Sequence, residues 1–377
     1  MTHYKNVIIG AGPAGLAVAG RMRKAGLDFQ ILEQSKNVGN SWRKHYDRLH
    51  LHTVKKWSHL PHMPFPDDYP TYVSRQQLVD YMDNYAQHFD IKPIYGKEIT
   101  WISKVGDKWQ IQDQKGEIIT TDHVVMATGL NRSPHIPIWK GQDDFTGTIS
   151  HSINYKNPKP YLEQKVLVVG IGNTGAEIAL DLSNSHIETH IAVRGEISLV
   201  PRDLNGRPVQ ETAKILEKLP FGFGDWLGGQ IRKIYFGDLS KYGLKVSKIH
   251  PVALLRDTGK TPLIDIGTIA AIKAGKITVQ GDIDHFTKNG VQFKNGKHIE
   301  LDAVILATGY RSKIESLVER ANEMLDTYGL PKNAIGVGHH KGLFFVGFDN
   351  YKTGGILGTI HNDSETVVHS LQHKKTA

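Results

Sequence analysis

The chain has 377 residues, a net charge of +8 with histidine neutral, and 39% hydrophobic residues, which is enough to build ordinary protein cores. It has no cysteine, which excludes a disulfide framework and any dithiol redox centre because both require thiols. The length predicts two to three domains. The positive charge is either ordinary surface charge or an attraction for anionic ligands. Nucleic-acid binding is not indicated, because the lysines and arginines are scattered along the chain.

The first predicted element is a buried parallel strand over residues 5–9, followed by a helix to about Lys24 and a second strand over residues 29–33. The apolar run 7–19 does not resemble a signal peptide, because glycines interrupt it and its basic leader is limited to Lys5. No run reaches the roughly 20 apolar residues of a membrane span. We therefore expect a soluble, unprocessed, cytoplasmic protein.

A glycine loop joins the first strand to the helix. It reads Gly10-Ala-Gly12-Pro-Ala-Gly15, and Glu33 follows 23 residues after Gly10. Glycines allow a pyrophosphate to approach the backbone, a helix N-terminus offers free N–H groups, and an acid at this spacing accepts hydrogen bonds from ribose. The alternative is a tight turn without a ligand. The predicted cofactor contacts are Gly10, Gly12, Pro13, Ala14, Gly15, Glu33 and Gln34.

Two histidines follow in the segment 39–52. Leu49 and Leu51 alternate with His50 and His52, which places both imidazoles on one face of an extended segment. This face is either a solvated strand surface or a portion of a site beside the nucleotide-binding unit.

Residues 60–70 contain four prolines and predict a fixed surface loop. Ser74 is a predicted N-cap for a helix to about Phe89. Residues 97–126 predict an antiparallel meander, which ends in Ala127-Thr128-Gly129.

The same order of elements then recurs. A second loop, Gly170-Ile-Gly172-Asn-Thr-Gly175, lies 160 residues after the first, and a helix, a strand over 188–193 and a meander over about 277–300 follow it. The repeat ends in Ala307-Thr308-Gly309-Tyr310. We therefore predict an α/β protein with two Rossmann-like dinucleotide-binding domains, each a βαβ unit with a β-meander. The predicted domain ranges are 1–157, 158–304 and 305–377.

The second repeat differs from the first at the residue expected to contact ribose. Arg194 stands where the first repeat has Glu33. An acid favours a free ribose 2′-hydroxyl, whereas arginine pairs with a 2′-phosphate, so we predict NADP(H) on the second loop. The alternative is a solvated arginine at a strand end. The predicted contacts here are Gly170, Gly172, Asn173, Thr174, Gly175 and Arg194.

Two later regions complete the chain. Residues 201–262 are irregular and include an apolar stretch over 219–229, so this region either lines a pocket or covers the edge of a sheet. Residues 342–348 predict a strand returning to the first domain. The helix that follows, from about 354 to Leu371, has an N-terminus suited to negative charge on a cofactor.

The segment 145–156, between the two loops, carries the strongest resemblance to a known family. Its residues fill every defined position of F-x-G-x-x-x-H-x-x-x-(Y/F)-(K/R), the shared marker of class B flavin-dependent monooxygenases, with Phe145, Gly147, His151, Tyr155 and Lys156. Members that perform Baeyer–Villiger reactions carry tryptophan at the Tyr155 position, so the chain resembles the flavin-containing, N- or S-oxygenating branch. The resemblance implies a glutathione-reductase-like architecture, with this segment as a hinge between the domains.

A more specific resemblance, to the plant YUCCA enzymes, extends over nearly the whole chain. It is carried by four further stretches, 42–52, 63–66, 259–267 and 355–358. The similarity implies oxidative decarboxylation of indole-3-pyruvate to indole-3-acetate. It also places His52 where typical flavin-containing monooxygenases have an active-site asparagine. The chain departs from related two-dinucleotide flavoproteins after Gly347, where Phe348 replaces an aspartate and Asp349 follows one residue later.

The resemblance implies FAD on the first loop, NADPH on the second, and O2 activated as a flavin C4a-(hydro)peroxide. The implied catalytic residues, His52, His151, Tyr155 and Lys156, would position the cofactors and substrate rather than act as nucleophiles. No metal is predicted. Further implied cofactor contacts are Ser41, Trp42, Arg43, Leu49, His52, Thr128, Gly129, Thr308, Gly309, Tyr310, Gly355 and Leu357.

Other activities stay open. The chain is alternatively an oxygenase of soft nitrogen or sulfur nucleophiles, an NADPH-dependent flavin reductase or electron-transfer protein, or a non-catalytic nucleotide sensor. A homo-oligomer is also open.

Overall fold

The structure is a computed structural model that describes residues 2–216, 223–349, 351 and 354–373. The chain forms two compact units. Unit 1 comprises residues 1–44, 49–133 and 310–377, and unit 2 comprises residues 45–48 and 134–309. Within the described ranges, no helix combines the length and apolar character needed to span a membrane.

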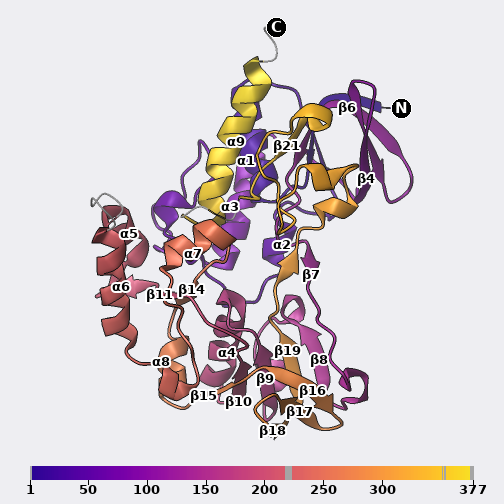
Figure 1. Ribbon diagram of the computed structural model, residues 1–377. Helices are drawn as coiled ribbons and strands as arrows, with labels where there is room; N and C mark the ends of the chain where they lie inside the picture. The colour runs from indigo at the N-terminus through magenta and orange to yellow at the C-terminus, as the bar shows by residue number, and fades with distance from the viewer. Residues whose placement is uncertain (1, 217–222, 350, 352–353, 374–377) are drawn as a thin grey trace. The chain divides into compact units, whose positions relative to one another are not determined.

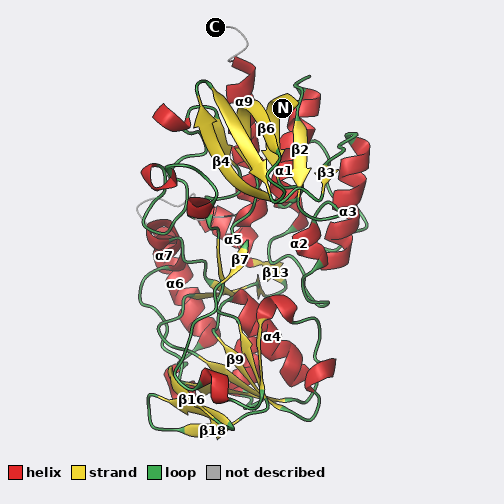
Figure 2. Cartoon of the chain, turned by 90° about the vertical axis from the view of Figure 1, so that its right-hand side faces the viewer, coloured by secondary structure: helices red, strands yellow, loops and turns green. Residues whose placement is uncertain are grey.

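Unit 1 is built on a mixed sheet. Its strands are β1 (Thr2–Ile9), β2 (Gln30–Glu33), β3 (Ile94–Tyr95), β4 (Ile99–Val105), β5 (Lys108–Asp113), β6 (Ile118–Met126) and β21 (Leu343–Phe345). The order is β3-β2-β1-β6-β5-β4, and β21 pairs with the C-terminal end of β6 (Figures 1 and 2). The strands β3, β2, β1, β6 and β21 are parallel, whereas β4, β5 and β6 form the predicted antiparallel meander.

Three helices pack on one face of this sheet, α1 (Pro13–Lys24), α3 (Arg75–His88) and α9 (Gly355–His373). A short fourth helix, α2 (Asn40–Arg43), contacts α3. The helices α1 and α9 lie side by side (Figure 1). Ser74 caps α3 through a reciprocal pair of hydrogen bonds with Gln77, as its position predicts.

The apolar run of β1 is buried on both faces. Ile8 packs in the layer formed by the helices, whereas Val7 and Ile9 pack in the opposite layer with Trp109 of β5. This two-sided burial explains why the strand shows no alternation of polar and apolar residues.

Unit 2 contains a parallel sheet. Its strands are β8 (Thr148–His151), β9 (Lys165–Val169), β10 (Glu188–Ala192), β15 (Ile277–Gln280) and β19 (Ala303–Leu306), in the order β15-β10-β9-β19-β8. A separate antiparallel sheet consists of β16 (Ile283–Thr287), β17 (Gly290–Phe293) and β18 (His298–Glu300). The expected start of the meander at about 277 is wrong, because residues 277–280 pair in parallel with β10.

The helices of unit 2 are α4 (Asn173–Asn184), α5 (Val209–Leu216), α6 (Phe223–Phe236), α7 (Pro251–Thr258) and α8 (Thr268–Lys273). Its short strands are β11 (Leu199–Pro201), β12 (Asp203–Leu204), β13 (Arg207–Pro208) and β14 (Leu263–Asp265). Two further short strands, β7 (Ser133–Pro134) and β20 (Tyr310–Arg311), lie at the unit boundaries. The described part of the region 201–262 therefore contains three helices, α5, α6 and α7, and is not irregular as expected. Some of its apolar stretch, within residues 217–222, lies outside the described residues.

The segment 145–156 belongs to unit 2 and is not a free linker. Its residues 148–151 form β8, an edge strand whose backbone pairs with β19. The N-terminal part of unit 1 therefore ends at Ser133, earlier than the boundary expected at 157. The second boundary follows Gly309, five residues after the expected one at 304. The predicted fold class, two α/β units that each combine a βαβ motif with a meander, is confirmed.

Candidate cofactor-binding sites

The first loop needs glycine at its two ends for reasons internal to the fold. Gly10 has a φ of 104°, and a Cβ there would lie 2.7 Å from the carbonyl oxygen of Ala127. A Cβ at Gly15 would lie 1.9 Å from the carbonyl oxygen of Gly10. Gly12 is different, because its φ of −77° suits any residue and its Cβ would meet no protein atom within 4 Å. The open space at Gly12 fits the close approach of a pyrophosphate to the N-terminus of α1.

The second loop repeats this geometry. Gly170 has a φ of 105° and a Cβ there would lie 2.7 Å from the oxygen of Ala307, while a Cβ at Gly175 would lie 1.9 Å from the oxygen of Gly170. Gly172, with a φ of −71°, again faces open space. Both loops therefore fit a dinucleotide pyrophosphate.

Glu33 is bonded into the loop that it follows. It is 7% exposed; its Oε2 accepts from the backbone N–H of Ala11 at 2.7 Å, and its Oε1 accepts from both the N–H and the hydroxyl of Ser35 at 2.8 and 2.7 Å. A carboxylate has about four acceptor positions, so Oε2 keeps one for a ribose hydroxyl. The sequence predicted a ligand contact for Glu33 but not this structural role. The role could have been anticipated from Ser35, which is a hydrogen-bond donor two residues later.

The two Ala-Thr-Gly segments differ in how their threonines are used. Within the described structure, Thr128 Oγ1 is buried without a hydrogen-bond partner, which fits a ligand acceptor beside the first loop. Thr308 Oγ1 donates to the carbonyl of His135 instead. Gly129 and Gly309 match each other, with φ of 78° and 86°.

Arg194 lies just beyond β10 and is exposed. Its guanidinium makes no hydrogen bond or ion pair with the described residues, which fits an arginine that meets an anion. Asn173 was expected to contact the cofactor, but its side chain is already engaged: Oδ1 accepts from Ile264 N–H at 2.7 Å, and Nδ2 donates to the Pro262 carbonyl at 3.3 Å. Asn173 therefore ties β14 to the start of α4. Thr174 lies in the first turn of α4, half-buried.

The predicted contacts around α2 also have structural partners. Gly39 N–H donates to the carbonyl of Ala11, so α2 begins beside the first loop. Arg43 pairs with Asp83 of α3 and donates to the carbonyl of Val38. The remaining predicted residues differ in exposure: Gln34 and Ser41 are exposed, Trp42 and Tyr310 are half-buried, and Leu49 is buried.

The structure brings His52 near the start of α9. Thr53, the next residue, lies so close to Gly355 that a Cβ on that glycine would be 2.9 Å from its methyl group. Gly355 has a φ of 77°, and Leu357 is buried in the core below. The predicted alternation holds, because Leu49 and Leu51 are buried whereas His50 is exposed and His52 half-buried. Where the expected aspartate would stand after Gly347, Phe348 is buried in the core, and Asp349 is half-buried.

Four residues of the family motif in 145–156, namely Phe145, Gly147, His151 and Tyr155, have a structural explanation. Phe145 packs in the core against Phe286, and a Cβ at Gly147 would lie 2.5 Å from the carbonyl oxygen of Asp302. His151 ends β8, level with Leu306. Sequence reasoning missed these roles because they depend on the pairing of β8 with β19.

His151 is held in one neutral tautomer. Its Nδ1 accepts from the N–H of Ile153 at 3.2 Å, so Nε2 carries the proton and donates to the carbonyl of Gly309 at 3.2 Å. Burial lowers the pKa of His151, and nearby His135 lowers it further. This tie connects the edge strand β8 to the Ala-Thr-Gly turn after β19.

Tyr155 is 1% exposed, and its hydroxyl donates to Asp181 of α4 at 2.7 Å. Burial strongly raises the pKa of this phenol. Lys156 is exposed, and its carbonyl accepts from the N–H of Asp47. Of the candidates named as catalytic, His52 belongs to unit 1 and the other three belong to unit 2.

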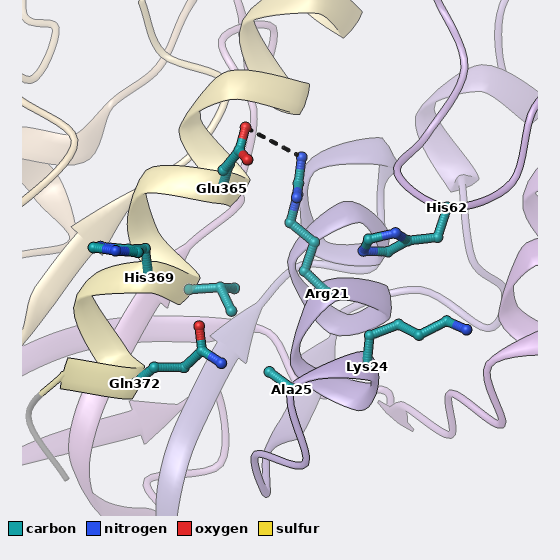
Figure 3. A pocket seen from close by; sticks show the side chains of 8 residues that line it. Arg21, Lys24, Ala25, His62, Glu365, His369 and Gln372 are labelled. Carbon is teal, nitrogen blue, oxygen red and sulfur yellow. Dashed lines mark ion pairs between the residues drawn. The ribbon is translucent and has the colours of Figure 1, made fainter.

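A surface cavity of about 290 Å³ lies between α1 and α9 (Figure 3). Arg21, Lys24 and His62 line one side, and Glu365 and His369 the other. Arg21 and Glu365 face each other across it as an ion pair of 3.7 Å. The cavity is at the C-terminal end of α1, roughly 15 Å from the glycine loop by helix length. It is separate from the first cofactor loop.

Comparison with known proteins identifies the family. Residues 3–329 match the family described as flavin-binding monooxygenase-like. The chain belongs to the flavin-binding monooxygenase-like family. Membership makes it a flavin-dependent oxidoreductase of the monooxygenase type, and the flavin of this family is FAD.

Individual proteins of known name or structure are also similar to this chain. The chain is 36% identical to the indole-3-pyruvate monooxygenase YUCCA1 of Oryza sativa subsp. japonica, over 94% of this chain and 88% of the relative. The fold is shared with a flavin-containing monooxygenase from Stenotrophomonas maltophilia at 19% identity, with a TM-score of 0.75 and 99% of both chains covered. It is also shared with a cyclohexanone monooxygenase from Rhodococcus sp. Phi1 bound to NADP+ at 18% identity, with a TM-score of 0.75 and coverage of 98% and 85%.

Proposed function

We propose that this protein is an FAD- and NADPH-dependent monooxygenase that oxidatively decarboxylates an aromatic 2-oxo acid such as indole-3-pyruvate. The observation that carries the proposal is the 36% identity, over 94% of the chain, to a rice indole-3-pyruvate monooxygenase. The reaction consumes one 2-oxo acid, NADPH, a proton and O2. It yields the acid shortened by one carbon, CO2, water and NADP+, with one oxygen atom in the new carboxyl group and the other in water.

We place FAD in unit 1. The open backbone at Gly12 would admit its pyrophosphate, Glu33 Oε2 would accept from its ribose, and the unpartnered Thr128 hydroxyl would gain an acceptor. The N-terminus of α9 at Gly355 would supply further N–H groups. FAD supplies acceptance of hydride and activation of oxygen when it is bound.

We place NADPH in unit 2. The pyrophosphate would lie on Gly172 at the N-terminus of α4, and the exposed Arg194 guanidinium would pair with the ribose 2′-phosphate. The bound NADP+ in the cyclohexanone monooxygenase of the same fold supports a nicotinamide nucleotide in such a protein.

The remaining candidates position ligands and keep water from the site. His52 would meet the carboxylate of the 2-oxo acid. His151 closes the edge of the unit 2 sheet against Gly309, and its neutral state avoids a buried charge. Exclusion of water matters because a wet site releases hydrogen peroxide instead of product.

The test is to incubate the FAD-loaded enzyme with NADPH and O2 in two arms, one with indole-3-pyruvate and one with a thioether. We expect indole-3-acetate in nearly equimolar ratio with the NADPH consumed, and little oxidation of the thioether. Sulfoxide as the main product would instead identify an oxygenase of soft nucleophiles. NADPH oxidation that yields only hydrogen peroxide in both arms would identify a flavin reductase.

A further inference from the structure

Four residues of the chain leave unit 1 and return to it. Residues 45–48 belong to unit 2, although Lys44 before them and Leu49 after them belong to unit 1. Tyr46 is 3% exposed, and its hydroxyl donates to Glu177 Oε2 of α4 at 2.6 Å. Glu177 is itself 2% exposed, so this bond lies in the interior of unit 2.

A second carboxylate of α4 lies one helical turn further along. Asp181 follows Glu177 by four residues, which places both on the same side of the helix. Asp181 Oδ2 accepts from the Tyr155 hydroxyl at 2.7 Å, and Oδ1 contacts Arg48 Nη1 at 3.3 Å. Two phenols and a guanidinium thus meet two carboxylates.

Segment 45–48 is also held by the residues that end the family motif. The N–H of Asp47 donates to the carbonyl of Lys156 at 2.9 Å, and Asn157 Nδ2 donates to Asp47 Oδ2 at 3.0 Å. The rings of Tyr46 and Tyr155 meet edge to face at 6.2 Å. Both α4 and residues 155–157 therefore hold this segment in place.

The same stretch of chain is attached to the first glycine loop at its other end. Gly39 N–H donates to the carbonyl of Ala11, α2 follows at once, and only Lys44 separates α2 from segment 45–48. The helix that receives these contacts, α4, begins within the second loop, at Asn173. One run of ten residues, 39–48, thus connects a hydrogen bond on loop 1 with the helix of loop 2.

We propose that Tyr46, Arg48 and Tyr155 are positioning residues that, through Glu177 and Asp181, couple binding of the nicotinamide nucleotide at the second loop to binding of FAD at the first. A buried carboxylate that loses its donor is costly, so α4 retains segment 45–48 firmly. The inference rests on the proposed placement of NADPH on Gly170–Gly175. It assigns Tyr155, the aromatic position of the motif, a role that requires no contact with the reacting atoms.

The test uses Tyr46→Phe, Tyr155→Phe and their combination, with Tyr161→Phe as the matched control. Tyr161 stacks on Tyr155 at 5.9 Å, but its hydroxyl lies 3.5 Å from the Ser150 hydroxyl. Arg48→Gln is the milder variant in case a phenol variant does not fold, because the Arg48 side chain is 29% exposed.

Two readouts need no turnover. The first is amide hydrogen exchange across residues 45–48, where we expect about tenfold faster exchange in each phenol variant and no change in Tyr161→Phe. The second is the Kd of NADP+ by titration, with and without FAD. Wild-type protein should bind NADP+ roughly 5- to 100-fold more tightly with FAD present, and the double variant should bring this ratio near one.

An unchanged ratio in the double variant, or unchanged exchange at 45–48, overturns the proposed coupling while leaving the assigned function intact. A wild-type protein that does not bind NADP+ in either state overturns the nucleotide assignment itself and the coupling with it. An equal rise of exchange in all peptides would mean global destabilisation and would also contradict the proposed role.

Discussion

Units 1 and 2 carry glycine loops with nearly the same backbone, and the residues that follow them are used differently. The opening glycines have φ of 104° and 105°, and both third glycines would clash at 1.9 Å if a Cβ were added. Yet Glu33 is buried and bonded to its own loop, whereas Arg194 is exposed. The residue proposed to contact ribose is therefore part of the folded core in unit 1 and a surface residue in unit 2.

The meanders differ in a related way. In unit 1, β6 runs unbroken from the meander into the parallel region of the sheet. In unit 2, residues 301–302 separate β18 from β19, and Asp302 accepts from Thr148 and Lys165 N–H groups at 2.9 and 2.8 Å. The break thus provides acceptors that hold β8 and β9.

The largest expected effect concerns the middle glycines. Gly12→Ala should weaken FAD binding about 100-fold, and Gly172→Ala should weaken NADP+ binding about 100-fold with FAD retained, because each methyl group would occupy the ligand's space. Neither should change the Tm of the ligand-free protein. Flavin content, NADP+ titration and thermal unfolding measure these effects. Gly15→Ala is the contrast, and it should destabilise the fold itself.

Arg194→Ala should raise the KM for NADPH on the order of 10- to 100-fold and leave the use of NADH unchanged, because only NADPH carries the 2′-phosphate. Steady-state kinetics with both nucleotides provides the measurement. Arg256→Ala, which removes another exposed arginine of unit 2, is the matched control. Equal weakening of both nucleotides would contradict the 2′-phosphate contact.

Glu33→Gln should lower the free energy of unfolding of the flavin-free protein by about 1.5 kcal/mol, because an amide cannot accept all three hydrogen bonds from Ala11 and Ser35. Arg194→Ala should change it by less than about 0.5 kcal/mol. Urea unfolding followed by circular dichroism compares the two. An equal loss of unfolding free energy in the two variants would contradict a structural role for Glu33 that Arg194 lacks.

The smallest expected effect is on pH. The pKa of His151 is lowered in the folded chain, chiefly by burial, from its ordinary 6.5. The unfolded chain therefore binds more protons just below pH 6.5, and stability should fall as pH drops through 6.5 toward the lower folded pKa. His151→Gln should reduce this loss by less than about 1 kcal/mol between about pH 7.5 and 5.5, by thermal unfolding. An unchanged pH slope would show that His151 is not responsible.

The sequence predicts the elements whose signals are local. The strands and helices around both glycine loops, the Ser74 cap and the first meander occur as expected, because apolar runs, glycines and caps act over a few residues. The parallel partner of β10 could not be anticipated, since 277–280 looks like any short apolar strand. The family motif could be found in the sequence. The roles of residues such as His151 could not, because they depend on the pairing of β8 with β19, which lies about 150 residues later in the chain.

The excursion of residues 45–48 has a consequence for dissecting the protein. A fragment covering 134–309 would contain the sheets and helices of unit 2 but would lack the Tyr46 hydroxyl that serves the buried Glu177. Such a fragment would leave Glu177 without its Tyr46 donor and Asp181 without its contact to Arg48. Unit 2 therefore consists of one continuous range, 134–309, and a four-residue segment, 45–48, from an earlier part of the same chain. Chimaeras that exchange nucleotide-binding domains between relatives should therefore exchange this segment with them.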